Sequence, residues 1–189
     1  MQIVDRATVA VYEARAGEWQ RRRGDATDGL GRKLRDEVGP GTIADLGCGT
    51  GRYFEEIGFP VVGVDATPAM LELARNRSAP LVRADLEALP FRTGRLAGAF
   101  ARHSYLHVPR ARLPDALVEL RRVIRPGGRV LLSMIEGAYE GDRLPGDDFP
   151  GRFFTLWNAH ELAETLRVAG FVDVCSSAHG SGVLVTGSR

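Results

Sequence analysis

Three alternating glycines, Gly47, Gly49 and Gly51, separate an apolar run at residues 42–46 from a helix-forming segment. Glycine adopts positive φ without steric cost and lets a ligand approach the bare backbone. The N-terminus of the following helix adds unpaired N–H groups that attract polar ligands. The dinucleotide fingerprint G-x-G-x-x-G would require glycine at position 52, where this chain has Arg52. The junction therefore predicts a ligand-binding loop whose glycine spacing differs from that of the dinucleotide-binding loop.

A second buried strand is expected at residues 60–65, and it ends in Asp65. This acid follows the glycine loop at about the distance at which a βαβ unit places its ribose-binding carboxylate. We interpret Asp65 as the acceptor of both ribose hydroxyls, with a simple loop cap as the alternative. A third expected strand, at residues 80–84, is followed directly by Asp85. Three successive strand ends thus carry residues suited to one ligand.

The run from Asp45 to Gly51 reads acidic-x-G-x-G-x-G and resembles the first motif of the class I S-adenosylmethionine (SAM)-dependent methyltransferases. In that family the acid tends to face the charged methionine end of the cofactor. Residues 85–91, DLEALPF, are similar to a D-x-x-x-L-P-F segment of the small-molecule group that includes the ubiquinone and menaquinone methyltransferases. The resemblance covers about residues 42–189 and implies SAM as the cofactor.

The resemblance also implies which residues hold the cofactor. Asp85 would accept the adenine amino group, and the backbone N–H of Leu86 would reach the ring. A neutral base between apolar walls needs such an acceptor and donor for orientation. Arg102, after the fourth strand, would line the cofactor. The expected cofactor contacts are Asp45, Gly47, Cys48, Gly49, Gly51, Asp65, Ala66, Asp85, Leu86, Arg102, Tyr12 and Trp19.

Three side chains after the fourth expected strand are candidates for a catalytic general base: His103, Tyr105 and His107. His107 corresponds to a histidine that is frequent at this place in the methyltransferase group, and His103 or Tyr105 would point into the acceptor cavity. A structural role, in which the histidine hydrogen-bonds a loop carbonyl, is the alternative. SAM carries an electrophilic methyl group, so placing the acceptor for in-line attack should contribute more than a base. A base matters only for acceptors such as alcohols or protonated amines.

The rest of the chain alternates strand and helix patterns, which predicts the α/β class. We expect a Rossmann-like, seven-stranded, mostly parallel sheet with helices on both faces and the last strand antiparallel, as one SAM-binding domain at residues 39–189. The further expected strands are residues 96–101, 128–134, 171–176 and 183–186, and the expected helices are residues 69–77, 110–124 and 159–169.

Two segments are expected to cover the cofactor edge of this sheet. Residues 1–38 predict a helical lid, in which Tyr12 and Trp19 either cover the cofactor or anchor the helix to the core. Residues 136–157 are too long for an ordinary connection in a compact domain. The segment ends in an aromatic cluster of Phe153, Phe154 and Trp157, and Arg152 could pair with an anionic substrate. This cluster predicts a segment that either faces the acceptor or packs against the core.

The composition indicates one domain of mixed charge. The chain has 189 residues, of which 44% are hydrophobic, and a formal net charge of +1. The basic runs at residues 21–23 and 121–122 are short. Nucleic-acid binders usually concentrate basic charge on one surface, and these runs do not require such a surface. The two cysteines, Cys48 and Cys175, lack metal-type spacing, so no metal site is expected. With no signal-like start and no run of about 20 apolar residues, we expect a cytoplasmic monomer or homodimer without a membrane span.

The leading hypothesis is a methyltransferase that moves the methyl group of SAM to an O, N, S or C atom of a small-molecule acceptor. The motifs of DNA-amino, pyrimidine-C5 and ribose 2′-O methyltransferases are absent, which disfavours a nucleic-acid acceptor. Methylation of a modified uridine in tRNA needs none of those motifs and stays open. Two further hypotheses are a SAM-binding protein without catalysis and a nicotinamide oxidoreductase, of which the latter fits the glycine spacing less well.

Overall fold

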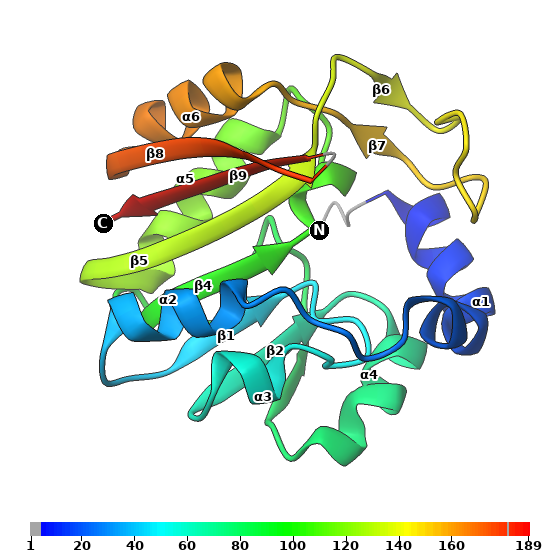
Figure 1. Cartoon of the computed structure of the whole chain (residues 1–189), viewed down its shortest axis with the longest axis horizontal. Coiled ribbons are helices and arrows are strands. Elements are labelled where there is room, and N and C mark those ends of the chain that lie inside the picture. Colours follow the sequence, from blue (N-terminus) through cyan, green and yellow to red (C-terminus); the bar gives the residue numbers. More distant parts are fainter. Residues whose placement is uncertain (1–4, 181) are drawn as a thin grey trace.

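One large sheet forms the centre of the molecule (Figure 1). The computed structural model describes residues 5–180 and 182–189, and within them the sheet contains β1 (Ile43–Leu46), β2 (Val61–Asp65), β3 (Leu81–Arg83), β4 (Leu96–Arg102), β5 (Ile124–Ile135), β8 (Val172–His179) and β9 (Gly182–Ser188). These strands lie in the order β3-β2-β1-β4-β5-β9-β8. The first five pair in parallel, whereas β9 is antiparallel to both β5 and β8. The predicted seven-stranded sheet with an antiparallel last strand is confirmed.

Helices cover both faces of this sheet, as predicted. The helices of the described residues are α1 (Arg6–Arg23), α2 (Leu30–Val38), α3 (Phe54–Ile57), α4 (Pro68–Ala74), α5 (Leu113–Val123) and α6 (Ala159–Val168), with short 3-10 helices η1 (Arg75–Arg77) and η2 (Tyr105–His107). α5 and α6 supply apolar side chains to the core on one face, and α2 and α3 supply them on the other. Within the described residues, no helix is long and apolar enough to cross a membrane.

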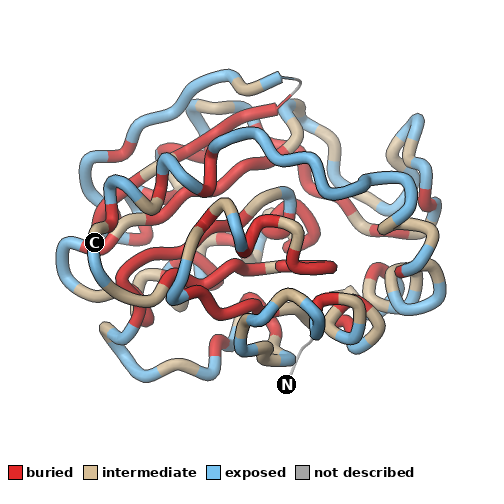
Figure 2. Tube along the Cα trace, turned by 60° about the horizontal axis from the view of Figure 1, so that its bottom comes forward, coloured by how far each residue is buried: buried red, intermediate tan, exposed pale blue. Residues whose placement is uncertain are grey.

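The central strands are buried on both sides, and Figure 2 shows buried residues running along them. In β1, Ala44 and Leu46 belong to the core shared with α5, whereas Ile43 belongs to the core shared with α2. This division follows from strand geometry, because successive side chains point to opposite faces. A strand covered by helices on both faces reads as a nearly continuous apolar run, which is the pattern that the sequence showed here.

The parallel strands bring their carboxyl ends to one edge of the sheet, and the glycine loop lies at that edge. Gly47, Gly49 and Gly51 all have positive φ, at 73°, 53° and 74°. Only glycine adopts this conformation readily, which explains the alternating pattern. The N–H groups of Gly47 and Cys48 both donate to the carbonyl oxygen of Val64, at 2.7 and 2.9 Å. The loop after β1 is thereby fixed to the end of β2.

Residues 1–38 were expected to form one lid, and their described part, residues 5–38, contains two helices with different positions. Only α1 lies at the edge that carries the glycine loop. α2 packs against α3, β4 and β5 through Leu30, Leu34 and Val38. These residues are spaced by four, so they form one apolar stripe, and an apolar stripe is buried against a core rather than held over a cavity. The part of the segment that can act as a lid therefore ends before α2.

Other differences from the expected elements concern their ends. The helix expected at residues 69–77 begins at Pro68, and its last turn is the 3-10 helix η1. Residues 125–127, which lie between the expected helix and the expected strand, belong to the long strand β5, whose pairing with β4 shifts register between Leu96 and Gly98. The last helix starts as predicted, because the side chain of Asn158 accepts a hydrogen bond from the N–H of Glu161 at 2.8 Å.

The position of α2 can be tested by comparing two neighbouring substitutions. Leu34 is 1% exposed, and truncating a buried leucine costs about 2–5 kcal/mol. Leu34→Ala should therefore lower the free energy of unfolding in urea by that amount. Lys33 is exposed on the same helix, so Lys33→Ala should change it by less than about 0.5 kcal/mol. Equal, small effects of both substitutions would contradict the assignment of α2 to the core.

Candidate active site

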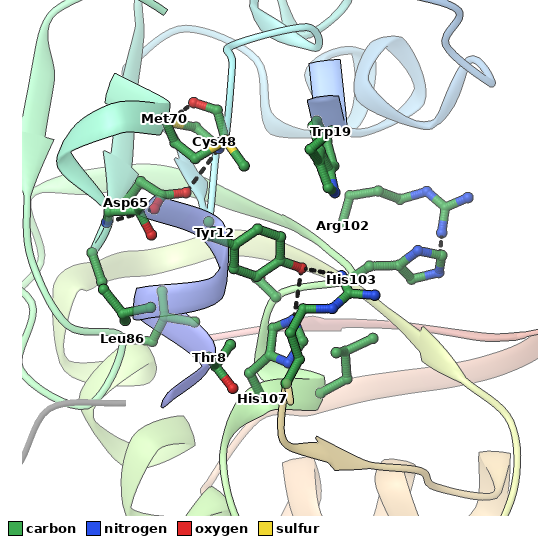
Figure 3. Close-up of a pocket in the computed structure, with 18 of the residues that line it drawn as sticks. Thr8, Tyr12, Trp19, Cys48, Asp65, Met70, Leu86, Arg102, His103 and His107 are labelled. Atoms are coloured by element: carbon green, nitrogen blue, oxygen red, sulfur yellow. Dashed lines mark hydrogen bonds between the residues drawn. The ribbon is translucent and has the colours of Figure 1, made fainter. Parts of the chain in front are cut away.

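A cavity of about 450 Å³ opens at the carboxyl edge of the sheet, between the strand ends, α1 and the segment that follows β5 (Figure 3). Most of the residues selected from the sequence surround it. Those that line it are Tyr12, Trp19, Gly47, Cys48, Gly49, Asp65, Ala66, Leu86, Arg102, His103 and His107. The chain thus gathers residues from five separate segments around one space.

Four selected residues lie outside the cavity wall. Asp45 is 1% exposed beneath the glycine loop, and Asp85 is buried with one carboxylate oxygen accepting the N–H of Glu87 at 3.0 Å. Gly51 has a packing role, because a Cβ there would lie 2.6 Å from the ring of Phe54.

Tyr105 is the fourth of these residues and corrects a prediction. Its side chain is 1% exposed and belongs to the core shared with α5, rather than pointing into the cavity. The reason is the 3-10 turn η2, in which successive side chains diverge by about 120°. Leu106 and His107 face the cavity, and Tyr105 is turned into the protein. Burial raises the pKa of its hydroxyl far above the ordinary range, so the group stays protonated.

The carboxylate of Asp65 links two loops at the cavity. One oxygen accepts the N–H of Gly49 at 2.9 Å, and the other accepts the N–H of Thr67 at 2.8 Å. Burial raises the pKa of Asp65, and these N–H donors act against that shift. Asp65 also lines the cavity, which places a carboxylate acceptor where ligand hydroxyls would lie. This geometry fits a pair of ribose hydroxyls.

Four buried polar atoms near the glycine loop have no hydrogen-bond partner within the described residues: Asp45 Oδ2, Thr50 Oγ1, Ser104 Oγ and Arg52 Nε. Leaving such a group unsatisfied costs about 1–3 kcal/mol. Burial and the nearby charge of Asp65 raise the pKa of Asp45 to about 8, despite the opposing charge of Arg52. A ligand that carries both an ammonium and a carboxylate group would supply the missing donors and acceptors. These residues therefore fit the amino-acid end of SAM.

His107 is held in one tautomer by its two neighbours. Its Nδ1 lies 2.6 Å from the carbonyl oxygen of Phe153, which can only accept, so Nδ1 carries the proton. Its Nε2 lies 3.0 Å from the hydroxyl of Tyr12 and therefore accepts from it. Burial lowers the pKa of His107 to about 4, so the ring is neutral at pH 7. The lone pair on Nε2 of His107 is therefore directed at the hydroxyl of Tyr12.

His103 is placed less favourably for taking up a proton. Its Nε2 lies 2.7 Å from a guanidinium nitrogen of Arg102, and a guanidinium only donates. The neutral ring must then carry its proton on Nδ1, so neither nitrogen offers a free lone pair. Desolvation of the ring and the charge of Arg102 lower the pKa of His103 to about 4.

The segment at residues 136–157 is ordered by a small sheet of β6 (Glu140–Gly141) and β7 (Phe154–Thr155) and closes the cavity against α1. Arg152 forms a buried ion pair with Asp147, and their side chains are 6% and 5% exposed. Arg152 also donates to the hydroxyl of Tyr12 at 2.7 Å, and the N–H of Phe153 donates to Thr8 Oγ1 at 2.8 Å. The charge of Arg152, expected from the sequence to be available to an anionic substrate, is neutralised within the protein.

Arg152 and Phe154 line the cavity and come from the segment that the sequence predicted to face the acceptor. The lining residues that were not identified from the sequence are Thr8, Val9, Arg23, Arg52, Tyr53, Thr67, Met70, Ala84, Ser104, Leu106 and Ile135. Thr8 carried a usable signal, since Thr8, Tyr12 and Trp19 fall on one face of a helix. The sequence analysis used Arg52 only to exclude a dinucleotide-binding loop. Its place directly after Gly51 also indicated that it would lie close to the cavity.

The buried ion pair generates a stability prediction with a neighbouring control. Asp147→Ala leaves Arg152 buried without its counter-charge and should lower the free energy of unfolding by about 3–5 kcal/mol. Asp148 pairs with Arg23 at the surface and is 43% exposed, so Asp148→Ala should cost less than about 1 kcal/mol. Urea unfolding of both variants measures the difference. Equal stability of the two variants would contradict this prediction, because it would show that Arg152 pairs with another group or becomes hydrated when Asp147 is removed.

Comparisons with known proteins agree with this geometry. A family model described as a methyltransferase domain matches residues 44–132. The malonyl-[acyl-carrier protein] O-methyltransferase of Serratia marcescens is 32% identical over 182 residues, which cover 86% of this chain and 69% of that protein. The uncharacterized methyltransferase YodH of Bacillus subtilis is 36% identical over 143 residues, which cover 68% of this chain and 59% of that protein.

A solved structure adds a ligand-bound example of the fold. The 1,6-didemethyltoxoflavin-N1-methyltransferase of Burkholderia thailandensis, with bound 1,6-didemethyltoxoflavin and S-adenosylhomocysteine, is 26% identical with a TM-score of 0.67. The similarity covers 95% of this chain and 88% of that one. Together with the glycine loop, the strand order and the extent of the Serratia match, these similarities show that the chain belongs to the class I SAM-dependent methyltransferases.

Proposed function

We propose that the protein uses SAM to methylate an O, N, S or C atom of a small-molecule acceptor, and that the cavity at the sheet edge holds both molecules. The observation that carries the proposal is the row of ligand-type residues at the ends of β1, β2 and β4, which meet around one cavity of about 450 Å³. A volume of this order is typical of small-molecule sites, which span about 300–1,000 Å³.

The proposed cofactor position runs along the strand ends. The amino-acid end lies over the glycine loop, where Asp45, Arg52 and Ser104 carry unsatisfied polar atoms. The ribose lies on Asp65, and the adenine lies against Leu86. Asp85 is buried beside Leu86, where its carboxylate accepts the N–H of Glu87 and stabilises the turn that follows β3. Its expected hydrogen bond to the adenine amino group remains a prediction.

When bound, SAM supplies an electrophilic methyl group on a sulfonium, and the task of the protein is placement. Tyr12 and Trp19 from α1 cover the space above the glycine loop, with the ring of Trp19 3.8 Å from where a Cβ of Gly49 would lie. Ile135 and Phe154 line the cavity from β5 and β7. Holding two reactants in attack geometry and excluding water contributes up to about 7–11 kcal/mol to lowering a barrier of this kind.

The acceptor is proposed only as a small molecule. By their names, the Serratia relative acts on malonyl-[acyl-carrier protein] and the Burkholderia enzyme on 1,6-didemethyltoxoflavin, so relatedness does not select one chemical class. None of the described features favours tRNA, a non-catalytic role or a nicotinamide cofactor over this proposal.

The test of the function is SAM turnover against a panel of acceptors, with S-adenosylhomocysteine as the measured product. The panel should include a carboxylate, a phenol, an alcohol, an amine and a thiol, with malonyl-CoA as the carboxylate probe. We expect product to accumulate with at least one acceptor and only in its presence. Tight binding of SAM without turnover of any acceptor would indicate a non-catalytic SAM-binding protein, and binding of NADH in place of SAM would contradict the assignment.

Asp45 makes cofactor binding dependent on pH. Its pKa of about 8 keeps the carboxyl protonated in the free protein at pH 7, and a bound ammonium group favours the ionised form. Binding of S-adenosylhomocysteine should therefore release a proton at pH 7, and its affinity should rise as the pH is raised towards 8. Calorimetry in two buffers with different ionisation heats counts the proton. Asp45→Asn should abolish the release, and an unchanged release would show that Asp45 does not meet the ammonium group.

Two glycines of the loop should respond differently to substitution. At Gly49 the positive φ strains any side chain, but a Cβ would meet only the ring of Trp19, at 3.8 Å, so Gly49→Val should fill cofactor space and abolish binding of S-adenosylhomocysteine, with some loss of stability. At Gly51 a Cβ would lie 2.6 Å from the ring of Phe54, so Gly51→Ala should chiefly destabilise the fold. Calorimetry and thermal unfolding separate the effects. Normal binding by Gly49→Val would place the cofactor elsewhere.

A further inference from the structure

We propose that Tyr12 is a catalytic residue, whose hydroxyl oxygen takes the proton of the acceptor while its own proton passes to Nε2 of His107. This inference rests on the proposed function and narrows it, because such a relay serves acceptors that bring a proton to the reaction, namely alcohols, phenols and amines. The sequence had suggested only a covering role for Tyr12.

The direction of the hydrogen bonds carries the inference. Phe153 fixes the proton of His107 on Nδ1, so Nε2 presents a lone pair to the hydroxyl of Tyr12 at 3.0 Å. Tyr12 must therefore donate to His107, which leaves its oxygen as an acceptor. Arg152 donates to that oxygen at 2.7 Å and uses one of its two lone pairs. The second lone pair remains for a proton donor in the cavity, which Tyr12 lines.

The place of Tyr12 is suited to this role. Figure 3 shows its ring between Asp65 on one side and His107 on the other, with the hydroxyl directed at His107. Asp65 marks the proposed ribose position. Ile135 and Phe154 line the same cavity, so an acceptor held against them would lie in the space that the hydroxyl of Tyr12 also lines.

The charges around the pair come from three segments. His107 is influenced by Arg152 and Asp147 of the 136–157 segment and by Asp5 at the start of α1. Tyr12 is influenced by the same Arg152 and Asp147 and by Asp65 of β2. Burial of both groups raises the pKa of Tyr12 and lowers the pKa of His107, and Arg152 lowers the pKa of His107 further, so the proton rests on Tyr12 in the free protein. Against this, Arg152 favours negative charge on the tyrosine oxygen, and Asp147 and Asp5 favour a positive charge on His107 once the acceptor releases its proton.

The step balances without another reactant. The acceptor atom forms a bond to the methyl carbon, and the bond from that carbon to sulfur breaks with its electron pair left on sulfur. The proton of the acceptor moves to Tyr12, and the Tyr12 proton moves to Nε2 of His107. The positive charge that began on sulfur ends on the imidazole ring, which later returns the proton to water. His107 needs only modest basicity, because a methylated alcohol that still carries its proton is a strong acid.

The first test compares three variants with the parent protein, using an acceptor from the panel. Tyr12→Phe keeps the ring and removes the hydroxyl, and His107→Gln removes the proton-accepting imidazole ring. Both should lower kcat by about 100-fold or more, the usual range for a general base, with the affinity for S-adenosylhomocysteine changed by less than about threefold. Tyr139→Phe is the matched control, since the Tyr139 hydroxyl accepts the N–H of Arg143 at 2.8 Å and does not line the cavity described above. It should behave like the parent.

Two readouts distinguish the relay from a packing role. Turnover by the parent should slow in D₂O, and Tyr12→Phe should lose that slowing. A variant that keeps kcat but binds acceptor or S-adenosylhomocysteine more weakly would show that Tyr12 only covers the site, which overturns the proposal. Equal kcat of parent and Tyr12→Phe on a carboxylate such as malonyl-CoA, with no turnover of any acceptor that carries a proton, would also overturn it.

A second test needs no acceptor. Nitrogen-15 spectra of the imidazole groups, with His107 identified by its loss in His107→Gln, should show a neutral ring with its proton on Nδ1 at pH 7. The Nε2 signal should shift in Tyr12→Phe, where its donor is lost. A charged ring, or a proton on Nε2, would overturn the relay. Failure of the parent to use any acceptor would instead count against the proposed function, while these spectra would still decide the state of His107.

Discussion

The carboxylate of Asp65 is the contact on which the geometry of the site depends. By accepting the N–H groups of Gly49 and Thr67, it fixes the glycine loop after β1 and the turn after β2 in one position. The parallel pairing of β1 with β2 brings those two loops to the same edge, and Val64 holds the glycine loop from below. A change in any of these contacts would move the proposed ribose and amino-acid positions together.

Around this contact the protein maintains polar groups that its own residues do not satisfy. Asp45, Arg52 and Ser104 each bury an atom without a partner in the described part of the chain, and His103 keeps a φ of 56°, which is uncommon for a residue other than glycine. Such costs persist only where the surrounding structure imposes them, and they concentrate at functional sites. By contrast, the charges of Arg102 and Arg152 are matched by Asp28 and Asp147, so they position other side chains rather than a substrate.

Much of this arrangement could be predicted from the sequence, for physical reasons. Glycines that need positive φ, and acids that end apolar strands, are local patterns, so the loop and Asp65 were identifiable. The prediction that Tyr105 points into the cavity was wrong because successive side chains of a 3-10 turn point in directions about 120° apart. The sequence does not show which of the neighbouring residues faces the cavity. The ties between Tyr12, His107 and Arg152 join residues as much as 140 positions apart, and no local pattern encodes them. The spacing of Leu30, Leu34 and Val38 by four residues already indicated that α2 packs against the core rather than covering the cavity.

The central claim is that SAM binds across the ends of β1 and β2 with its reactive end facing Tyr12. A crystal structure of the parent protein with S-adenosylhomocysteine tests it most directly. We expect the amino-acid end over Gly49 and within reach of Asp45 and Ser104, both ribose hydroxyls on Asp65, and the adenine against Leu86. Density for the ligand outside this cavity, or a ribose that does not contact Asp65, would contradict the claim.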